Sequence, residues 1–321
     1  GERMSSTTSN CIELQHLKKY FNTKKGQLHA VDDINIKIEK GTTLGVVGES
    51  GCGKSTLGRT TLKLLEPTEG KILFEGQDIT GNSEKKMIAM RKHMQLIFQD
   101  PYSSLNPRQT IADIVAEPFK IFKTYKNKNE MYDRVDELLE TVGLAKMYAY
   151  SYPHELDGGR RQRAGIARAI AMNPEFIVCD EPVSALDVSI QAQILNLLMD
   201  LQEAKKLTYM FITHDLSVVK HISTNIMVMY LGQCVEYASS SELFKNPVHP
   251  YTQALLNAVP IPSLHGRKLS QSLIAGELTS PIDPPKGCRF AARCPYATDK
   301  CRKEDVPLKE ISPGHMVACI L

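Results

Sequence analysis

The residues with the clearest chemistry form one turn, Gly48-Glu49-Ser50-Gly51-Cys52-Gly53-Lys54-Ser55-Thr56. This turn fits the pattern G-x-x-x-x-G-K-[ST] and follows an apolar run at residues 43–47, the strand, turn and helix context in which the pattern indicates phosphate binding. Glycines let successive backbone N–H groups approach anionic oxygens, and the positive end of the following helix adds to the attraction. We therefore expect Lys54 to neutralise the β- and γ-phosphates of a nucleotide and the Ser55 hydroxyl to hold Mg²⁺.

Four more polar residues follow apolar runs that are typical of buried strands. Asp180 could hold Mg²⁺ through water, and Glu181 could polarise the attacking water as a general base. Gln99 could bind Mg²⁺ or the water, and His214 ends another apolar run. Singly these signals are weak, because a strand often ends in polar residues and a lone histidine is usually structural. Ligands of open α/β sheets bind at the carboxyl ends of strands, so together the four residues predict one catalytic site.

The elements that must position these groups alternate between apolar and amphipathic segments. We expect strands within residues 12–18, 34–38, 43–47, 71–74, 95–98, 176–179 and 209–213, a helix over 190–201, and charged helical structure from 111 to about 147. Strands that alternate with helices imply an α/β fold, with a mostly parallel sheet covered on both faces. The charged helical stretch predicts an inserted helical subdomain at about residues 100–172.

Length and composition are those of an ordinary globular protein with about two domains, since 321 residues exceed the ~150 of a typical domain. The net charge of 39 − 36 = +3 is too small to indicate nucleic-acid binding. No apolar stretch approaches the ~18 residues of a membrane span and no hydrophobic leader precedes the fold, so we expect a cytoplasmic protein. We expect residues 1–11 to be a cloning remnant and a disordered leader, 12–260 the main domain, and 261–321 a small irregular C-terminal extension rich in cysteine.

The segment Leu156-Asp157-Gly158-Gly159-Arg160-Arg161-Gln162 places two glycines before a helix rich in small residues, a second helix N-terminus suited to anions. With this segment the chain resembles an ABC-type ATPase over roughly residues 12–255. The resemblance is carried by the phosphate loop, Gln99, the segment at 156–162, Asp180-Glu181, the turn Ser184-Ala185-Leu186-Asp187, and His214. It implies a P-loop NTPase core that acts on ATP and Mg²⁺, with Tyr20 or Phe21 as the aromatic residue that stacks on adenine.

Such ATPases work as head-to-tail pairs, so the resemblance also implies a division of roles. Lys54 and Glu181 would serve the ATP bound by this chain, with His214 contacting its γ-phosphate. The signature residues would serve the ATP of a second, similar but non-identical ATPase subunit; they are Asp157, Gly158, Gly159 and Gln162. Two membrane-spanning permease subunits would dock on the helical subdomain, and an extracytoplasmic binding protein would deliver the solute to them. Nucleic acid is not an expected partner.

Asp157 departs from the family pattern, which has serine at this position. A serine hydroxyl can donate a hydrogen bond to the γ-phosphate, whereas an ionised aspartate only accepts hydrogen bonds and repels the phosphate. Either Asp157 points away and the glycine N–H groups suffice, or the partner's ATP site that this signature completes hydrolyses ATP poorly.

Four cysteines cluster near the C-terminus as Cys288, Cys294, Cys301 and Cys319. A reducing cytoplasm argues against disulfides, and the C-x5-C-x6-C-x17-C spacing is wider than the pairs usual for structural zinc. Four thiolates can also hold an iron–sulfur cluster, and reduced thiols without metal remain possible. Residues 287–295 and 246–252 resemble the C-terminal extension of oligopeptide and dipeptide importer ATPases. That resemblance implies a [4Fe-4S] cluster, with zinc as the alternative.

Together these patterns predict an ATPase subunit of an importer for dipeptides or oligopeptides, at the cytoplasmic face of the bacterial inner membrane. The same branch includes importers of nickel and other small solutes, and these remain an alternative. A soluble ABC ATPase that acts on DNA or ribosomes is a second alternative, although such proteins usually carry two cassettes or a long insertion. A regulatory module that binds but does not hydrolyse nucleotide is a third, and the intact set of Lys54, Asp180, Glu181 and His214 argues against it.

Overall fold

The computed structural model describes residues 10–258 and 280–320. The chain divides into two compact units that are described separately below. The first comprises residues 10–11, 39–42 and 81–210, and the second comprises residues 12–38, 43–80, 211–258 and 280–320. The expected boundary at 260–264 and most of the expected leader lie outside the described residues. No helix in residues 10–258 and 280–320 has the length and apolarity that crossing a bilayer requires.

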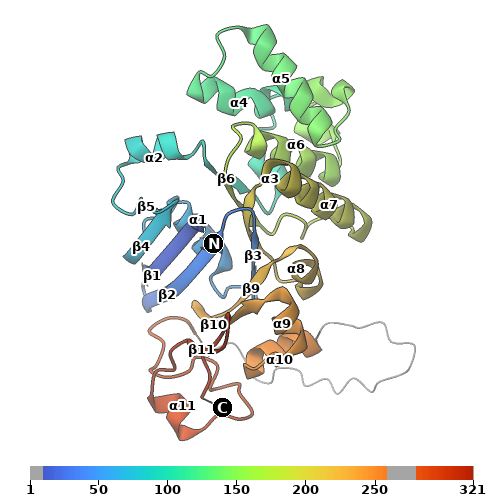
Figure 1. Ribbon diagram of the computed structural model, residues 1–321. Helices are drawn as coiled ribbons and strands as arrows, with labels where there is room; N and C mark the ends of the chain where they lie inside the picture. The colour runs from blue at the N-terminus through green and yellow to red at the C-terminus, as the bar shows by residue number, and fades with distance from the viewer. Residues whose placement is uncertain (1–9, 259–279, 321) are drawn as a thin grey trace, which may run out of the picture. The chain divides into compact units, whose positions relative to one another are not determined.

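The second unit contains a four-stranded sheet in the order β2-β1-β4-β5 (Figure 1). Its strands are β1 (Asn10–Thr23), β2 (Gly26–Glu39), β4 (Glu69–Phe74) and β5 (Gln77–Asp78). The pairings of β4 with β1 and β5 are antiparallel, which the expectation of one mostly parallel sheet did not include. In β2, Ile34, Ile36 and Ile38 are buried while the residues between them are exposed, the pattern of a strand with one covered face.

The phosphate loop of the second unit follows β3 (Thr43–Val47), which runs parallel to β9 (Asn225–Tyr230). β9 pairs antiparallel with β10 (Gln233–Ser239), whose other edge holds the hairpin of β11 (Lys309–Ser312) and β12 (His315–Val317). The helices are α1 (Lys54–Thr61), α8 (Leu216–Ile222), α9 (Ser240–Lys245), α10 (Pro250–Asn257) and α11 (Asp299–Lys303). The C-terminal segment therefore extends the sheet of the phosphate-loop unit through β12, where an irregular extension was expected.

The first unit places the short strands β6 (Met94–Ile97) and β7 (Phe176–Asp180) side by side and parallel. Its helices are α2 (Glu84–Met90), α3 (Pro101–Ser104), α4 (Ile111–Phe122), α5 (Lys128–Thr141), α6 (Gly158–Ile170) and α7 (Val188–Lys205), with short 3₁₀ turns at Lys146–Tyr150 and Pro153–Glu155. The side chains of Thr110, Asn127 and Asp157 cap α4, α5 and α6 at their N-termini. β8 (Thr208–Ile212) crosses the division between the units.

Candidate functional site

The phosphate loop of the second unit has the strand, turn and helix geometry that the pattern predicts. All five residues of β3 are buried, and α1 begins at Lys54 with Gly53 as its N-cap residue. Lys54 is 5 % exposed, and its Nζ donates to the carbonyl oxygens of Gly48 at 2.8 Å and Glu49 at 3.0 Å. Ser55 and Thr56 follow in the first turn of α1. The ammonium group thus lies inside the loop, where it can neutralise bound phosphates.

At two glycines of the loop, the backbone of another segment lies so close that any side chain would clash with it. Gly53 has φ +103°, and a Cβ there would lie 1.9 Å from the carbonyl oxygen of Ala30. Gly48 has φ +154°, and a Cβ there would lie 2.2 Å from the carbonyl oxygen of Met229. Gly51 also has a positive φ, +78°, but a Cβ at that position would meet nothing within 4 Å. The spacing of glycines in the motif therefore follows from contacts with distant strands as well as from the turn itself.

His214 lies at the same sheet edge as the phosphate loop. The N–H of the preceding residue, Thr213, donates to the carbonyl oxygen of Val46 at 3.1 Å, and Val46 is two residues before Gly48. The next residue, Asp215, caps α8 by accepting a hydrogen bond from the Ser217 N–H at 2.8 Å. His214 is exposed in the tight turn between β8 and α8, so its ring can reach a ligand at this edge.

The first unit brings Gln99 and Glu181 together. β6 and β7 are paired in register with Ile97 opposite Cys179, so two residues further along each chain Gln99 comes opposite Glu181. Gln99 Nε2 donates to Glu181 Oε2 at 2.9 Å. Asp180 is the last residue of β7 and is 2 % exposed. Gln99 and Glu181 therefore meet at one strand edge, directly after Asp180, and oxygen ligands of these types are suited to holding Mg²⁺ and orienting a water molecule.

Glu181 also adopts a strained backbone conformation. Its φ is +47°, in the left-handed region that non-glycine residues rarely occupy. The backbone N–H of Ser184 donates to the Glu181 carbonyl oxygen at 3.3 Å, and the Ser184 hydroxyl donates to it at 3.1 Å. Strain of this kind, held in place by the turn that follows, occurs preferentially at functional sites.

The signature segment forms the N-terminus of α6, and both glycines lie inside the first helical turn, not before the helix as expected. Asp157 Oδ1 accepts a hydrogen bond from the Arg160 N–H at 2.8 Å, and the other carboxylate oxygen pairs with the Arg160 guanidinium. A Cβ on Gly159 would lie 2.7 Å from Ile190 in α7, so this close helix packing requires glycine. Gln162 is 1 % exposed and Gly159 is also buried, whereas Asp157 is exposed and Gly158 is half-buried.

The two aromatic candidates for adenine stacking have different surroundings. The Tyr20 ring stacks on His29 with centroids 3.9 Å apart, and its hydroxyl donates to the Asp32 carboxylate. Burial and the hydrogen bond to Asp32 raise the pKa of Tyr20, which keeps the phenol protonated. The neighbouring Phe21 ring is contacted by the Lys19 ammonium 4.8 Å from its centroid. Tyr20 is thus held by an internal network.

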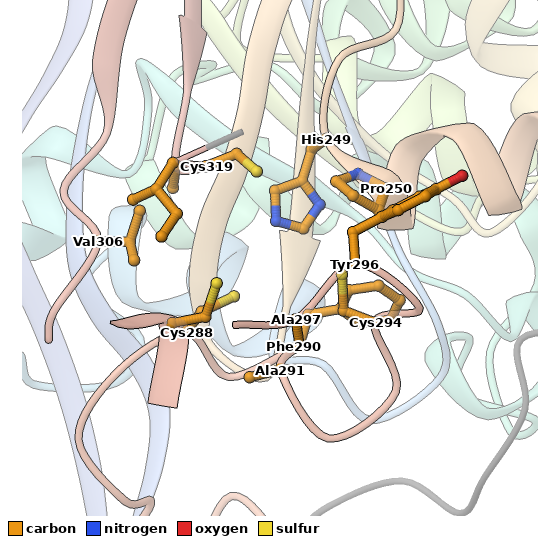
Figure 2. Close-up of a pocket in the computed structure, with 13 residues that line it drawn as sticks. His249, Pro250, Cys288, Phe290, Ala291, Cys294, Tyr296, Ala297, Val306 and Cys319 are labelled. Carbon is orange, nitrogen blue, oxygen red and sulfur yellow. The ribbon is translucent and has the colours of Figure 1, made fainter. Parts of the chain in front are cut away.

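The four C-terminal cysteines line one pocket with a volume of about 320 Å³, part of which is open to solvent. Figure 2 shows Cys288, Cys294 and Cys319 around this space, with the ring of His249 facing into it. The other lining residues are mostly apolar and include Phe290, Val306 and Ile320. Burial lowers the pKa of His249 to about 4, so its ring is neutral at pH 7.

The arrangement of the pocket thiols bears on which metal centre they could hold. Within residues 10–258 and 280–320, no three His, Cys, Asp or Glu side chains stand close enough to share one metal ion. Four sulfurs bound to one zinc at ~2.3 Å would lie about 3.8 Å apart, so this set does not match a zinc ion. A cluster that contains several iron atoms holds its thiolates further apart, and a set of four cysteines around an apolar pocket fits that donor chemistry. Hydrogen bonds from Thr298 lower the pKa of Cys301, which favours its thiolate form.

Three arginines near these sites were not singled out from the sequence. Arg160 pairs with Asp157, while Arg289 and Arg293 connect the cysteine-rich segment to residues around the phosphate loop. Arg289 and Arg293 are each adjacent to a pocket cysteine, and that adjacency was the only local signal for them. Their partners lie more than two hundred residues away in the chain, so no local pattern could have identified the pairs.

Comparison with known proteins places both parts of the chain in one family. Residues 31–184 match the ABC transporter family, and residues 235–301 match the C-terminal region of oligopeptide/dipeptide transporters. The oligopeptide transport ATP-binding protein AppF of Bacillus subtilis is 53 % identical, with 97 % of each chain covered. The dipeptide transport ATP-binding protein DppF of Haemophilus influenzae is 47 % identical, with 94 % of each chain covered.

Solved structures support the same assignment. The dimeric ATP-binding cassette MJ0796, in a post-hydrolysis state bound to ADP and Pi, superposes with a TM-score of 0.66 at 29 % identity. That alignment covers 71 % of this chain and 98 % of the cassette. The chain therefore belongs to the ABC transporter family, in its branch of oligopeptide and dipeptide transport ATP-binding proteins.

Proposed function

We propose that this chain is the ATP-hydrolysing subunit of a bacterial importer for dipeptides or oligopeptides. The observation that carries the proposal is the combination, on one chain, of a formed phosphate loop with the C-terminal region of this transporter branch. The names of relatives that match nearly the whole chain agree with it. The test is uptake of labelled peptides by cells in which this chain carries Glu181→Gln. Uptake that falls for peptides supports the proposal, whereas a loss confined to nickel or another small solute contradicts it.

In the proposed mechanism the chain positions and neutralises a phosphoryl group during its transfer to water. Lys54 offsets charge on the β- and γ-phosphates, and His214 contacts the γ-phosphate from the turn after β8. Mg²⁺, which supplies further charge neutralisation when bound, would be held by Ser55, Gln99 and Asp180. Glu181 orients the water and takes its proton, in a position that its hydrogen bond with Gln99 stabilises.

For the base, we propose that adenine stacks on Phe21. The ring of Tyr20 already packs on His29, and its hydroxyl is bound to Asp32. Phe21 lacks a polar group that would need a partner, and the Lys19 ammonium lies over its ring. Aromatic rings with an accessible face bind bases in a sequence-tolerant way, which suits this role.

The signature of this chain would complete the ATP site of a second, non-identical ATPase in a head-to-tail pair. The pair would drive two permease subunits from the cytoplasmic face of the membrane, and an extracytoplasmic binding protein would supply the solute. The N–H groups of Gly158 and Gly159, in the first turn of α6, would point the positive helix end toward the partner's γ-phosphate. Asp157 places a carboxylate at that point, whose charge Arg160 offsets in part, and the remaining negative charge weakens the partner's site.

The substitution Asp157→Ser is expected to speed hydrolysis at the partner's site about fivefold, since removal of one close repulsion is worth about 1 kcal/mol, and so to raise total ATP turnover of the assembled complex by up to about twofold. Serine is also a good N-cap residue, so the stability of α6 should change little. Phosphate release under saturating MgATP measures the effect. Asp157→Asn is the matched control, because it removes the charge without supplying a hydroxyl. If neither variant exceeds the wild-type rate, the proposed repulsion is absent.

We also propose that Cys288, Cys294, Cys301 and Cys319 hold a [4Fe-4S] cluster. The support is the convergence of four thiols on one largely apolar pocket. When bound, the cluster would supply a cross-link within the C-terminal segment 288–319. Its role would be structural, or it would mediate contacts between subunits.

The full chain, purified without oxygen, is expected to contain about four iron atoms and about four sulfides. Replacing Cys288 and Cys294 together by serine should remove the iron and its visible absorbance. The matched control is Cys234→Ser, a thiol in β10 outside the pocket, which should leave the iron content unchanged. Zinc in place of iron, or equal iron in all three proteins, contradicts the assignment.

A further inference from the structure

The cysteine-rich segment reaches the phosphate loop through one arginine. Arg293, which precedes the pocket residue Cys294, forms two parallel bonds to the carboxylate of Glu49 in the loop. The Nη1–Oε2 distance is 2.7 Å and the Nη2–Oε1 distance is 3.0 Å. The side chains are 6 % and 23 % exposed, so the pair is largely shielded from water. A bidentate pair in such surroundings is stronger and more directional than a surface ion pair.

Further contacts hold the same two residues in place. The backbone N–H of Glu49 donates to the Tyr251 hydroxyl at 2.8 Å, and Arg293 Nη1 donates to the Tyr230 hydroxyl at 3.3 Å. The two tyrosines pack with Phe290 in one aromatic cluster, with ring centroids 4.7 to 5.4 Å apart. Phe290 also lines the cysteine pocket. Glu49 is therefore held at its side chain and at its backbone by residues from the C-terminal part of the unit.

A second arginine of the segment reaches the expected base-binding side. Arg289, which follows Cys288, binds the Asp32 carboxylate and the Leu231 carbonyl oxygen, and its side chain is 5 % exposed. Asp32 in turn accepts the hydrogen bond from Tyr20, the neighbour of Phe21. Both ends of the expected nucleotide site are thus tied to the turn between Cys288 and Cys294.

These contacts matter because the phosphate loop must present its backbone N–H groups in one geometry. Glu49 follows Gly48 and lies outside both β3 and α1, so the ladders of strand and helix do not hold its side chain. Lys54 and the Cys52 N–H bind the Glu49 carbonyl oxygen, while its carboxylate and its N–H are held by Arg293 and Tyr251. Displacement of such a group by about 1 Å can cost as much as 10²-fold in a binding or reaction step.

We propose that Arg293 is a positioning residue for ATP, acting through Glu49, and that the cysteine-rich segment is thereby a working part of the nucleotide site. The claim goes beyond peptide import, since it would hold whichever solute the importer carries. It also predicts that a change in the pocket that displaces Cys294 alters ATP affinity.

The test is the dissociation constant of MgATP for the full chain. Arg293→Ala is expected to weaken binding by about ten- to hundredfold. Arg293→Lys should give an intermediate value, because lysine keeps the charge but loses the two-pronged geometry. Lys303→Ala, an exposed cation of the same segment in α11, is the matched control and should bind MgATP as the wild type does. Thermal melting without nucleotide shows whether each variant is folded.

A double-mutant cycle with Glu49→Ala separates this mechanism from general damage. If Arg293 acts through Glu49, the double variant binds MgATP about as weakly as the weaker single variant. Losses that multiply would mean that Arg293 acts independently of Glu49, and the proposal would be wrong. Wild-type affinity in a folded Arg293→Ala protein would also overturn it. If Arg293→Ala does not fold, the same criteria apply to Arg293→Lys, alone and in the cycle.

Discussion

Replacement of Glu181 by glutamine is expected to slow ATP hydrolysis at this chain's own site by ~10²–10⁴-fold, the usual contribution of a positioned general base. Glutamine has the same shape and cannot take the proton of the attacking water. It can keep a hydrogen bond with Gln99, so the strained turn at φ +47° should survive. ATP binding should stay near the wild-type level, because Lys54 is unchanged. Steady-state phosphate release and MgATP titration measure the two quantities separately.

The size of the loss also reports on the second site of the pair. If Asp157 weakens the partner's site, most turnover passes through the site that contains Glu181, and the variant loses most of its ATPase activity. A rate that falls only by about half would show that both sites contribute equally. Glu203→Gln, at an exposed position of α7, is the matched control and should leave hydrolysis unchanged. Hydrolysis at the wild-type rate in Glu181→Gln would assign the base to another residue.

Gly53→Ala is expected to abolish MgATP binding and to lower the free energy of unfolding by at least ~3 kcal/mol. The new Cβ would lie 1.9 Å from the Ala30 carbonyl oxygen, and backbone atoms cannot move aside as a flexible side chain would. The loop or β2 must shift, and either shift displaces the N-terminus of α1. Urea unfolding and MgATP titration of the full chain test both parts of the prediction.

The control for this effect is another glycine of the same loop. Gly51 also has a positive φ, +78°, but a Cβ there has nothing within 4 Å. Gly51→Ala should therefore lower the free energy of unfolding by only about 1 kcal/mol, the cost of a left-handed backbone conformation in a residue with a Cβ. Equal losses in the two variants would mean that backbone strain alone explains the effect and that the contact with Ala30 is unimportant.

Much of the catalytic site could be recognised from the sequence alone because its residues occur in short local motifs. The phosphate loop needs a strand, a glycine-rich turn and a helix in succession, and β3, Gly53 and α1 follow in that order. Asp180 and Glu181 were expected at a strand end, and β7 ends at Asp180. Most of the expected strands are present in the structure, because burial of a strand leaves a local pattern of apolar residues in the sequence.

The other features of the fold and of the site depend on contacts between distant segments of the chain. The pairing of Gln99 with Glu181 depends on the register of β6 against β7, and no local pattern encodes a register. The antiparallel sheet and the strands β9 and β10 were not predicted, because which strands pair with one another depends on the tertiary fold. Arg293 and Glu49 lie 244 residues apart, so their ion pair exists only in the folded chain. The type and order of the residues thus determine which reaction this protein can catalyse. Which residues hold the catalytic groups in place is determined by tertiary contacts, because side-chain direction and strand register depend on the packing of the whole unit.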